Sequence, residues 1–153
     1  MKIDFRVDDL AVQRTLARLG ERARNLAPVF REIGEGVKAE AQIGFKSSTD
    51  PYGRAWHPLA KATIARRRKG SSKPLLDTGR LRNSIASRLL GAGGVEVGTN
   101  LKYAAIHQFG GKAGRGLTVS IPARPYIATP ERGLPREYGE VIRDALARYF
   151  AKV

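Results

Sequence analysis

The sequence has no cysteine and only two histidines among its 153 residues. The lack of cysteine excludes disulfide bonds, thiolate nucleophiles and cysteine-ligated metal sites. No closely spaced set of histidines and carboxylates indicates another kind of metal site. The phosphate-binding pattern GxxxxGK[ST] is missing, as are the zinc-ligand and RNP signatures of proteins that read nucleic-acid sequences. We therefore expect no cofactor, no metal and no sequence-specific nucleic-acid contact.

Long apolar runs are also lacking. No stretch of the sequence approaches the roughly 20 apolar residues that cross a bilayer, so we expect no membrane contact. Residues 1–6 do not form the apolar segment with a small-residue cleavage site that marks a secretory signal. The expected place of assembly is a cytoplasm.

Acidic residues are scarce, since 14 aspartates and glutamates stand against 28 lysines and arginines, for a net charge of +14. Such a charge favours association with polyanions such as nucleic acid through counterion release. Alternatively, the basic residues only form solvated helix faces. The run Arg66, Arg67, Arg68 and Lys69 has two interpretations: it could face DNA phosphates, or it could complement the negative end of a short helix.

The composition, 42% hydrophobic and 27% charged, is typical of a globular protein. There is no internal repeat and no change of composition along the chain, so residues 1–153 are expected to form one domain. Alternation of apolar and polar residues at 3–7 predicts a short strand. Asp8 or Asp9 would then cap a first helix.

A second, longer helix is expected to begin at Pro28 and to continue through Phe45, because its apolar residues recur at spacings of three and four. Its glycines, including Gly34 and Gly36, lower the intrinsic stability of a helix. They would also permit a close neighbour, so this helix is expected to depend on packing.

The remaining segments alternate short elements with loops. The expected elements are a β-hairpin at 84–90 and 94–98, helical turns at 103–109, a strand at 117–121 and a closing amphipathic helix after Pro135. Flexible loops are expected at about 66–74 and 110–117. These patterns predict the α+β class, with N-terminal long helices and a C-terminal helix flanking a small antiparallel sheet.

Several single residues have a predicted structural role. Trp56, the only tryptophan, follows a dense cluster of turn formers at 47–53 and is expected to anchor either the core or an interface. Asp77 or Thr78 would cap a short helix. Arg124 lies between two prolines, which would hold it on a rigid extended segment.

Catalysis would depend on few residues. His57 and His107 could act as acid and base in phosphodiester cleavage, with Asp50 or Asp77 as partners. Both histidines lie in local contexts that structural histidines more often occupy. The sequence therefore predicts a protein that is not an enzyme, and a small nuclease is the third-ranked hypothesis.

Five blocks of sequence occur in an order that is informative as a set. They are PYGRAWHPL at 51–59, LLDTGRLRNSI at 75–85, VGTN at 97–100, YAAIHQFGG at 103–111 and IPARPYI at 121–127. Together they resemble the phage virion morphogenesis proteins, or tail-completion proteins, of Mu-like and P2-like contractile-tailed phages. The resemblance covers about residues 45 to 130. The residues that match the family's blocks are Trp56, Asp77, Gly79, Arg80, Tyr103, His107, Gly110 and Arg124.

This resemblance implies a structural role at the neck or the head-proximal end of the tail, in tail completion and head–tail joining. It implies a ring of subunits around the DNA channel, with a hexamer expected from the symmetry of a contractile tail. The implied partners are further copies of the chain and other neck and tail proteins, such as the tail tube or terminator and the head connector. The implied location is the virion, after assembly in the host bacterial cytoplasm. The second-ranked hypothesis is a sequence-nonspecific nucleic-acid-binding protein.

Overall fold

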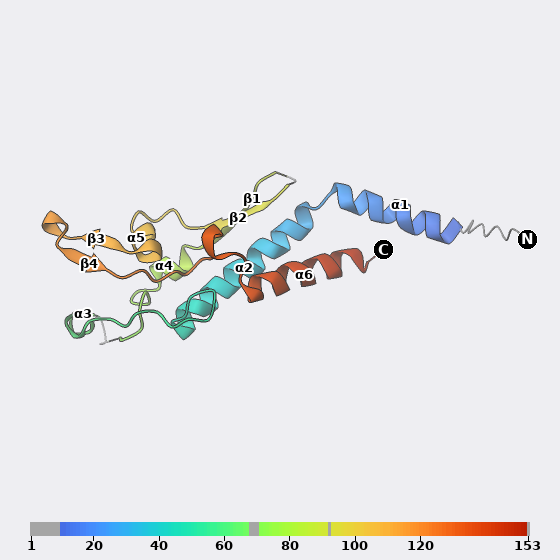
Figure 1. Cartoon of the computed structure of the whole chain (residues 1–153). Helices are drawn as coiled ribbons and strands as arrows, with labels where there is room; N and C mark the ends of the chain where they lie inside the picture. The colour runs from blue at the N-terminus through green and yellow to red at the C-terminus, as the bar shows by residue number, and fades with distance from the viewer. Residues whose placement is uncertain (1–9, 68–70, 92, 153) are drawn as a thin grey trace, which may run out of the picture.

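The three longest helices determine the shape of the molecule. The structure, a computed structural model, describes residues 10–67, 71–91 and 93–152. These helices are α1 (Leu10–Arg24), α2 (Ala27–Ser47) and α6 (Arg136–Phe150). In Figure 1, α6 lies beside α2, whereas α1 extends away from the rest of the molecule. The strand expected at 3–7 and the cap expected at Asp8 or Asp9 lie outside the described residues.

Helix α2 forms the centre of the fold, as its spacing of apolar residues predicts. Pro28 occupies its first turn, where a missing N–H has no cost. The buried residues of this helix are Val29, Ile33, Gly34, Ala41 and Phe45. A Cβ atom built on Gly34 would lie 2.6 Å from Val95 Cγ2, and one on Gly36 would lie 2.4 Å from Val141 Cγ1. Small residues therefore allow both a β-hairpin and α6 to approach α2 closely.

Two antiparallel ladders replace the single small sheet expected from the sequence. Strands β1 (Ala86–Leu89) and β2 (Val95–Gly98) pair with Ala86 opposite Gly98, and this hairpin packs on α2. Strands β3 (Gly111–Ala113) and β4 (Val119–Ile121) pair with Gly111 opposite Ile121. A 3-10 turn, η2 (Arg115–Leu117), lies between them. The segment expected to be a flexible loop at 110–117 contains β3 and η2, and the α+β class is confirmed.

The remaining elements are short: α3 (Lys61–Arg66), α4 (Arg80–Asn83), α5 (Ala104–Phe109) and the 3-10 turn η3 (Pro130–Arg132). Helix α3 is the short helix that the sequence places directly before the basic run at 66–69. Helix α5 confirms the helical turns predicted at 103–109. No helix within the described ranges is long and apolar enough to span a membrane.

Aromatic residues form the main core. The Phe45 ring meets Trp56 edge-on, with centroids 5.4 Å apart, and lies 5.5 Å from the Tyr126 ring. Trp56 is only 6% exposed, and its indole Nε1 donates a hydrogen bond of 2.7 Å to the Pro125 carbonyl. Trp56 is therefore a core anchor, the first of its two predicted roles. A second cluster of Val29, Ile33 and Ala145 joins α2 to α6.

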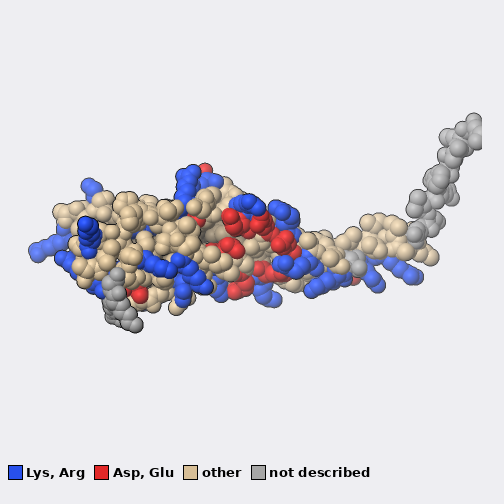
Figure 2. Space-filling model, turned by 90° about the horizontal axis from the view of Figure 1, so that it is seen from below, with Lys and Arg blue, Asp and Glu red and all other residues tan. Residues whose placement is uncertain are grey.

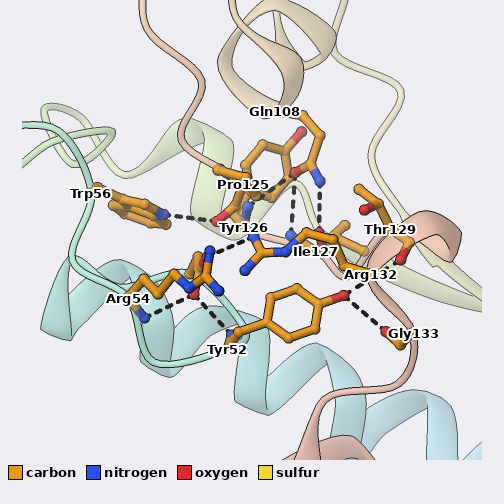
Figure 3. A network of polar contacts seen from close by, with 11 residues as sticks. Tyr52, Arg54, Trp56, Gln108, Pro125, Tyr126, Ile127, Thr129, Arg132 and Gly133 are labelled. Atoms are coloured by element: carbon orange, nitrogen blue, oxygen red, sulfur yellow. Dashed lines mark hydrogen bonds and ion pairs between the residues drawn. The ribbon is translucent and has the colours of Figure 1, made fainter.

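The turn after α2 connects the two halves of the chain through Asp50 (Figure 3). Asp50 Oδ1 accepts hydrogen bonds from the Tyr52 and Arg54 backbone N–H groups, both at 2.9 Å. Its Oδ2 forms an ion pair of 2.9 Å with Arg132 Nη1. The Arg132 guanidinium also lies over the Tyr52 ring, 3.9 Å from its centroid. The segment before α6 is thereby fixed against the turn that follows α2.

Candidate functional site

A cleft of about 570 Å³ lies between distant segments of the chain. Its wall comes from four separate segments: residues 57–67, residues 75–81, α5 with the residue before it, and β4 with the extended chain that follows. The cleft contains six of the eight residues that match the family's blocks: Asp77, Gly79, Arg80, Tyr103, His107 and Arg124. Residues scattered over 48 positions of the sequence, from 77 to 124, therefore meet at one site.

The turn at residues 77–81 forms one wall of the cleft. The prediction that Asp77 or Thr78 caps α4 is wrong, because the residue before the helix is Gly79 and no side chain caps the helix. Gly79 has φ 76°, a left-handed conformation that favours glycine. Thr78 Oγ1 instead accepts a hydrogen bond of 3.3 Å from the Arg80 N–H. This geometry buries Leu81 in the core while Asp77 and Arg80 stay exposed.

Arg124 connects three parts of the wall. Its side chain is 6% exposed and donates from Nε to the His57 carbonyl at 2.7 Å and from Nη2 to the Pro58 carbonyl at 3.0 Å. Its backbone N–H donates to the His107 carbonyl at 2.8 Å. Burial, and secondarily the charge of Arg67, lowers the pKa of Arg124. The guanidinium is thus engaged in holding the fold, as the rigid segment between the prolines predicts.

The structure places both histidines in the wall of this cleft. The Nδ1 atom of His107 is buried and has no hydrogen-bond partner among the described residues. The ring lies 5.9 Å from the Tyr103 ring in an edge-on arrangement. Burial lowers the pKa of His107, and the charges of Arg124 and Arg67 lower it further, so the site favours the neutral imidazole. His57 is exposed, and its Nδ1 lies 3.0 Å from the Pro58 carbonyl.

Gly110 and Trp56, the other two residues of the family's blocks, lie outside the cleft wall. Gly110 has φ 74°, and a Cβ atom there would lie 2.9 Å from the Ala123 backbone nitrogen. Any other residue would therefore separate α5 from the chain after β4. Both residues stabilise segments that form the cleft wall. Trp56 does so through its hydrogen bond to the carbonyl of Pro125, the residue that follows Arg124.

Gln108 is a structural residue that the sequence analysis missed. It is 7% exposed, and its Nε2 donates to the Ile127 carbonyl at 2.6 Å, while its Oε1 accepts from the Tyr126 N–H at 3.0 Å (Figure 3). A buried amide bonded on both sides holds the extended chain against α5. The only signal in the sequence was a polar residue inside the YAAIHQFGG block.

The two described residues of the basic run at 66–69, Arg66 and Arg67, lie in different environments. Arg66 is exposed at the end of α3, and Arg67 lines the cleft and donates to the Lys73 carbonyl. Arg68 and Lys69 lie outside the described residues. Figure 2 shows Asp and Glu gathered in a central zone with Lys and Arg on both sides of it. On the face that Figure 2 draws, an acidic zone therefore lies within a chain whose net charge is +14.

Nothing in the cleft forms a metal centre: among the described residues, no group of three or more histidines, aspartates or glutamates could hold a metal ion. Its wall combines aliphatic side chains with polar ones, which include three arginines and two histidines. The arrangement suits contact with another molecule.

Comparison with known proteins identifies the family. A model of the phage virion morphogenesis family matches residues 7–151, so the chain belongs to that family. The match extends well beyond the 45–130 region of the sequence resemblance. The Mu-like prophage FluMu G protein 2 of Haemophilus influenzae is 40% identical over 121 residues, which cover 78% of this chain and 79% of the relative. No solved structure shows significant similarity to the chain.

Proposed function

We propose that this phage morphogenesis protein is a structural component of the neck or head-proximal tail end, where it completes the tail and joins it to the head. Family membership supports a role in building a virion. The observation that favours binding over catalysis is the use of Arg124, whose guanidinium is occupied by two backbone carbonyls. The cleft residues that match the family's blocks therefore serve to form a binding surface.

In this proposal, six copies form a ring around the DNA channel. A closed ring requires head-to-tail contacts between different surfaces of identical subunits. The net charge of +14 would place basic surface near DNA, where it screens phosphate charge without reading sequence. The cleft, the hairpin β1–β2 and the hairpin β3–β4 are the surfaces available for the tail tube or terminator, the head connector and neighbouring copies.

The test is electron microscopy of particles from a phage that lacks the protein, with purified protein added back in a parallel sample. We expect full heads and unattached tails without the protein, and joined particles after its addition. A variant with Arg80→Ala in the cleft should fold but join fewer particles, whereas Arg54→Ala, at an exposed position outside the cleft and both hairpins, is the matched surface control. Normal infectious particles in the absence of the protein would refute the proposal.

A second candidate, a nucleic-acid-binding protein with or without nuclease activity, is favoured by one specific observation. The cleft brings His57 and His107 together with Arg67 and Arg80, which is the set of side chains that phosphodiester cleavage by acid and base would use. Duplex DNA incubated with the wild type and with the His57→Ala/His107→Ala variant distinguishes the two roles. Cleavage that depends on the histidines would support the nuclease, and intact DNA would support binding alone.

A further inference from the structure

Helix α1 is exposed along its length in the described part of the chain. None of its 15 residues is buried, and the apolar side chains of Val12 and Leu16 are 46% and 61% exposed. Val12, Leu16 and Leu19 follow one another at spacings of four and three, so they form one stripe along the helix. An isolated helix of about 12–15 residues is only marginally stable in water. Helix α1 is therefore expected to be covered in the functional state.

The direction of α1 is fixed at its C-terminal end. The Arg22 guanidinium lies 5.0 Å from the centroid of the Tyr149 ring and donates to the Tyr149 carbonyl. The Tyr149 hydroxyl donates to the Asn25 carbonyl at 2.6 Å. These contacts to the end of α6 direct α1 away from its own subunit, as Figure 1 shows. Its apolar stripe therefore stays exposed beside the described part of its own subunit.

A furrow between α2 and α6 has the complementary charge. It comprises a hollow of about 440 Å³ and a smaller one of about 180 Å³, and both are lined by Glu40 and Glu137. Six of the fourteen acidic residues of the chain line the larger hollow together with Arg148: Glu32, Glu35, Glu40, Glu137, Glu140 and Asp144. Three of them pair with basic residues of the same chain, Glu32 with Arg148, Glu35 with Lys38 and Glu140 with Arg136, which leaves Glu40, Glu137 and Asp144. Figure 2 shows a zone of acidic residues on the face that it draws. The furrow also has an apolar floor, to which Val141 and Ile43 contribute.

Helix α1 matches this furrow in charge and length. It contains four arginines (Arg14, Arg18, Arg22 and Arg24) and one glutamate (Glu21), so its net charge is +3. Its 15 residues extend about 22 Å, and the furrow follows α2 from residue 32 to residue 44 for about 18 Å. A second copy of this chain is therefore an occupant of matching charge, apolar content and size.

We infer that α1 of one subunit docks into the α2–α6 furrow of the next subunit. The contact joins two different surfaces, so each subunit has one free helix and one free furrow, and repetition leads to a closed ring or an open filament. This inference rests on the proposed ring and identifies its contact.

Disulfide trapping tests the contact, because the natural chain has no cysteine. Leu16 lies near the middle of α1 and Val141 near the middle of the furrow, so the pair Leu16→Cys/Val141→Cys should meet whichever way α1 runs. On oxidation we expect a ladder of covalent oligomers in denaturing electrophoresis. The matched control Leu16→Cys/Arg88→Cys, with its second cysteine on the exposed β1 strand, should form at least tenfold less of the ladder. A ladder of equal intensity in the control, no ladder, or an intrachain disulfide would overturn the inference.

Charge reversal tests the direction of the contact. Arg18→Glu/Arg24→Glu should disable α1, because these two arginines flank its apolar stripe, and Glu137→Lys/Asp144→Lys should disable the furrow. Neither change should unfold the protein, because these side chains lie at the surface. Neither variant should associate with itself, but an equimolar mixture should associate, because an intact α1 meets an intact furrow and a reversed α1 meets a reversed furrow. Combining all four reversals in one chain should restore association. A mixture that stays monomeric while the wild type associates would refute the head-to-tail contact.

The joining assay separates this inference from the proposed function. Wild-type protein that joins heads to tails but gives no ladder would overturn the contact and leave the function. A ladder together with normal particles in the absence of the protein would support the contact and overturn the function.

Discussion

Gly34 and Gly36 permit the close packing of α2, and their replacement by alanine provides a quantitative test of the fold. Alanine in the interior of a helix is favoured over glycine by about 1 kcal/mol. At these two positions we expect that gain to be lost, because the new methyl group would enter space already occupied. The Cβ atom would lie 2.4 Å from Val141 Cγ1 at position 36 and 2.6 Å from Val95 Cγ2 at position 34.

The size of the effect follows from the neighbours. Valine is branched at Cβ and has few alternative rotamers, so neither Val141 nor Val95 can turn aside easily. Overpacking of this kind costs about 1–3 kcal/mol, which exceeds the helix gain of about 1 kcal/mol. At position 34 the Cβ of Ser87 is also only 2.9 Å away. Gly34→Ala should therefore be the more destabilising substitution, by up to about 2 kcal/mol net.

Gly139→Ala is the matched control. Gly139 lies in α6, and a Cβ there would meet only Leu134 Cδ2 at 3.7 Å, an ordinary contact. This variant should become more stable by about 0.5–1 kcal/mol. Urea unfolding followed by the fluorescence of Trp56, the only tryptophan and a buried one, measures all three variants.

A double-mutant cycle identifies the cause of the destabilisation. If the clash with Val141 is the reason, Gly36→Ala/Val141→Ala should be more stable than the sum of the two single effects by about 0.5–3 kcal/mol. A Gly36→Ala variant that gains as much stability as Gly139→Ala, or a cycle without coupling, would refute the close packing of α2 against α6.

Three further predictions concern buried polar groups. Burial acts to raise the pKa of Asp50, but hydrogen bonds from the Arg54 N–H, Arg132 and the Tyr52 N–H outweigh it and hold that pKa below the usual 3.8. The carboxylate therefore stabilises the folded state above pH 3.8, and this contribution is lost as the pH falls through the lowered value. The free energy of unfolding should decline less steeply in acid for Asp50→Asn than for the wild type. Trp56→Phe should cost about 1–3 kcal/mol in urea unfolding, because it leaves the Pro125 carbonyl unbonded, and an unchanged stability would contradict the 2.7 Å hydrogen bond. Burial raises the pKa values of both Tyr126 and Tyr138 from 10.0 to about 12, so the ultraviolet phenolate signal should show two of the five tyrosines ionising last. Because these tyrosines ionise earlier in the unfolded chain, stability should fall as the pH rises from 10.0 toward 12.

Local patterns in the sequence were sufficient to predict the long elements. Helix α2 combines a proline in its first turn with apolar residues at helical spacing, and both signals act within a few residues. The β1–β2 hairpin surrounds a glycine cluster that indicates a reversal. The strand predicted at 117–121 contains β4, whereas β3 and its pairing with β4 were missed, because β3 has only three residues in a glycine-rich stretch whose composition indicates a flexible loop.

The cleft could not be predicted in the same way, because it depends on contacts between distant segments. The hydrogen bond from Arg124 Nε to the His57 carbonyl joins residues 67 positions apart. The proline-flanked sequence predicted that Arg124 would be held rigidly, but it contained no signal for the partner. The cap of α4 was mispredicted for a local reason: Thr78 and Asp77 are good caps by type, yet the left-handed Gly79 occupies the position before the helix.

The distribution of charge reconciles self-assembly with a positive surface. Copies of a chain with a net charge of +14 repel one another, so assembly requires a local region of opposite sign. The α2–α6 furrow supplies that region, because it gathers six carboxylates from two helices that are far apart in sequence. Filling it with α1 of the next subunit would bury negative charge at each contact and leave the uncompensated arginines and lysines outside. A ring assembled in this way would therefore present a more positive surface than its separated subunits, which is the property that a DNA channel needs.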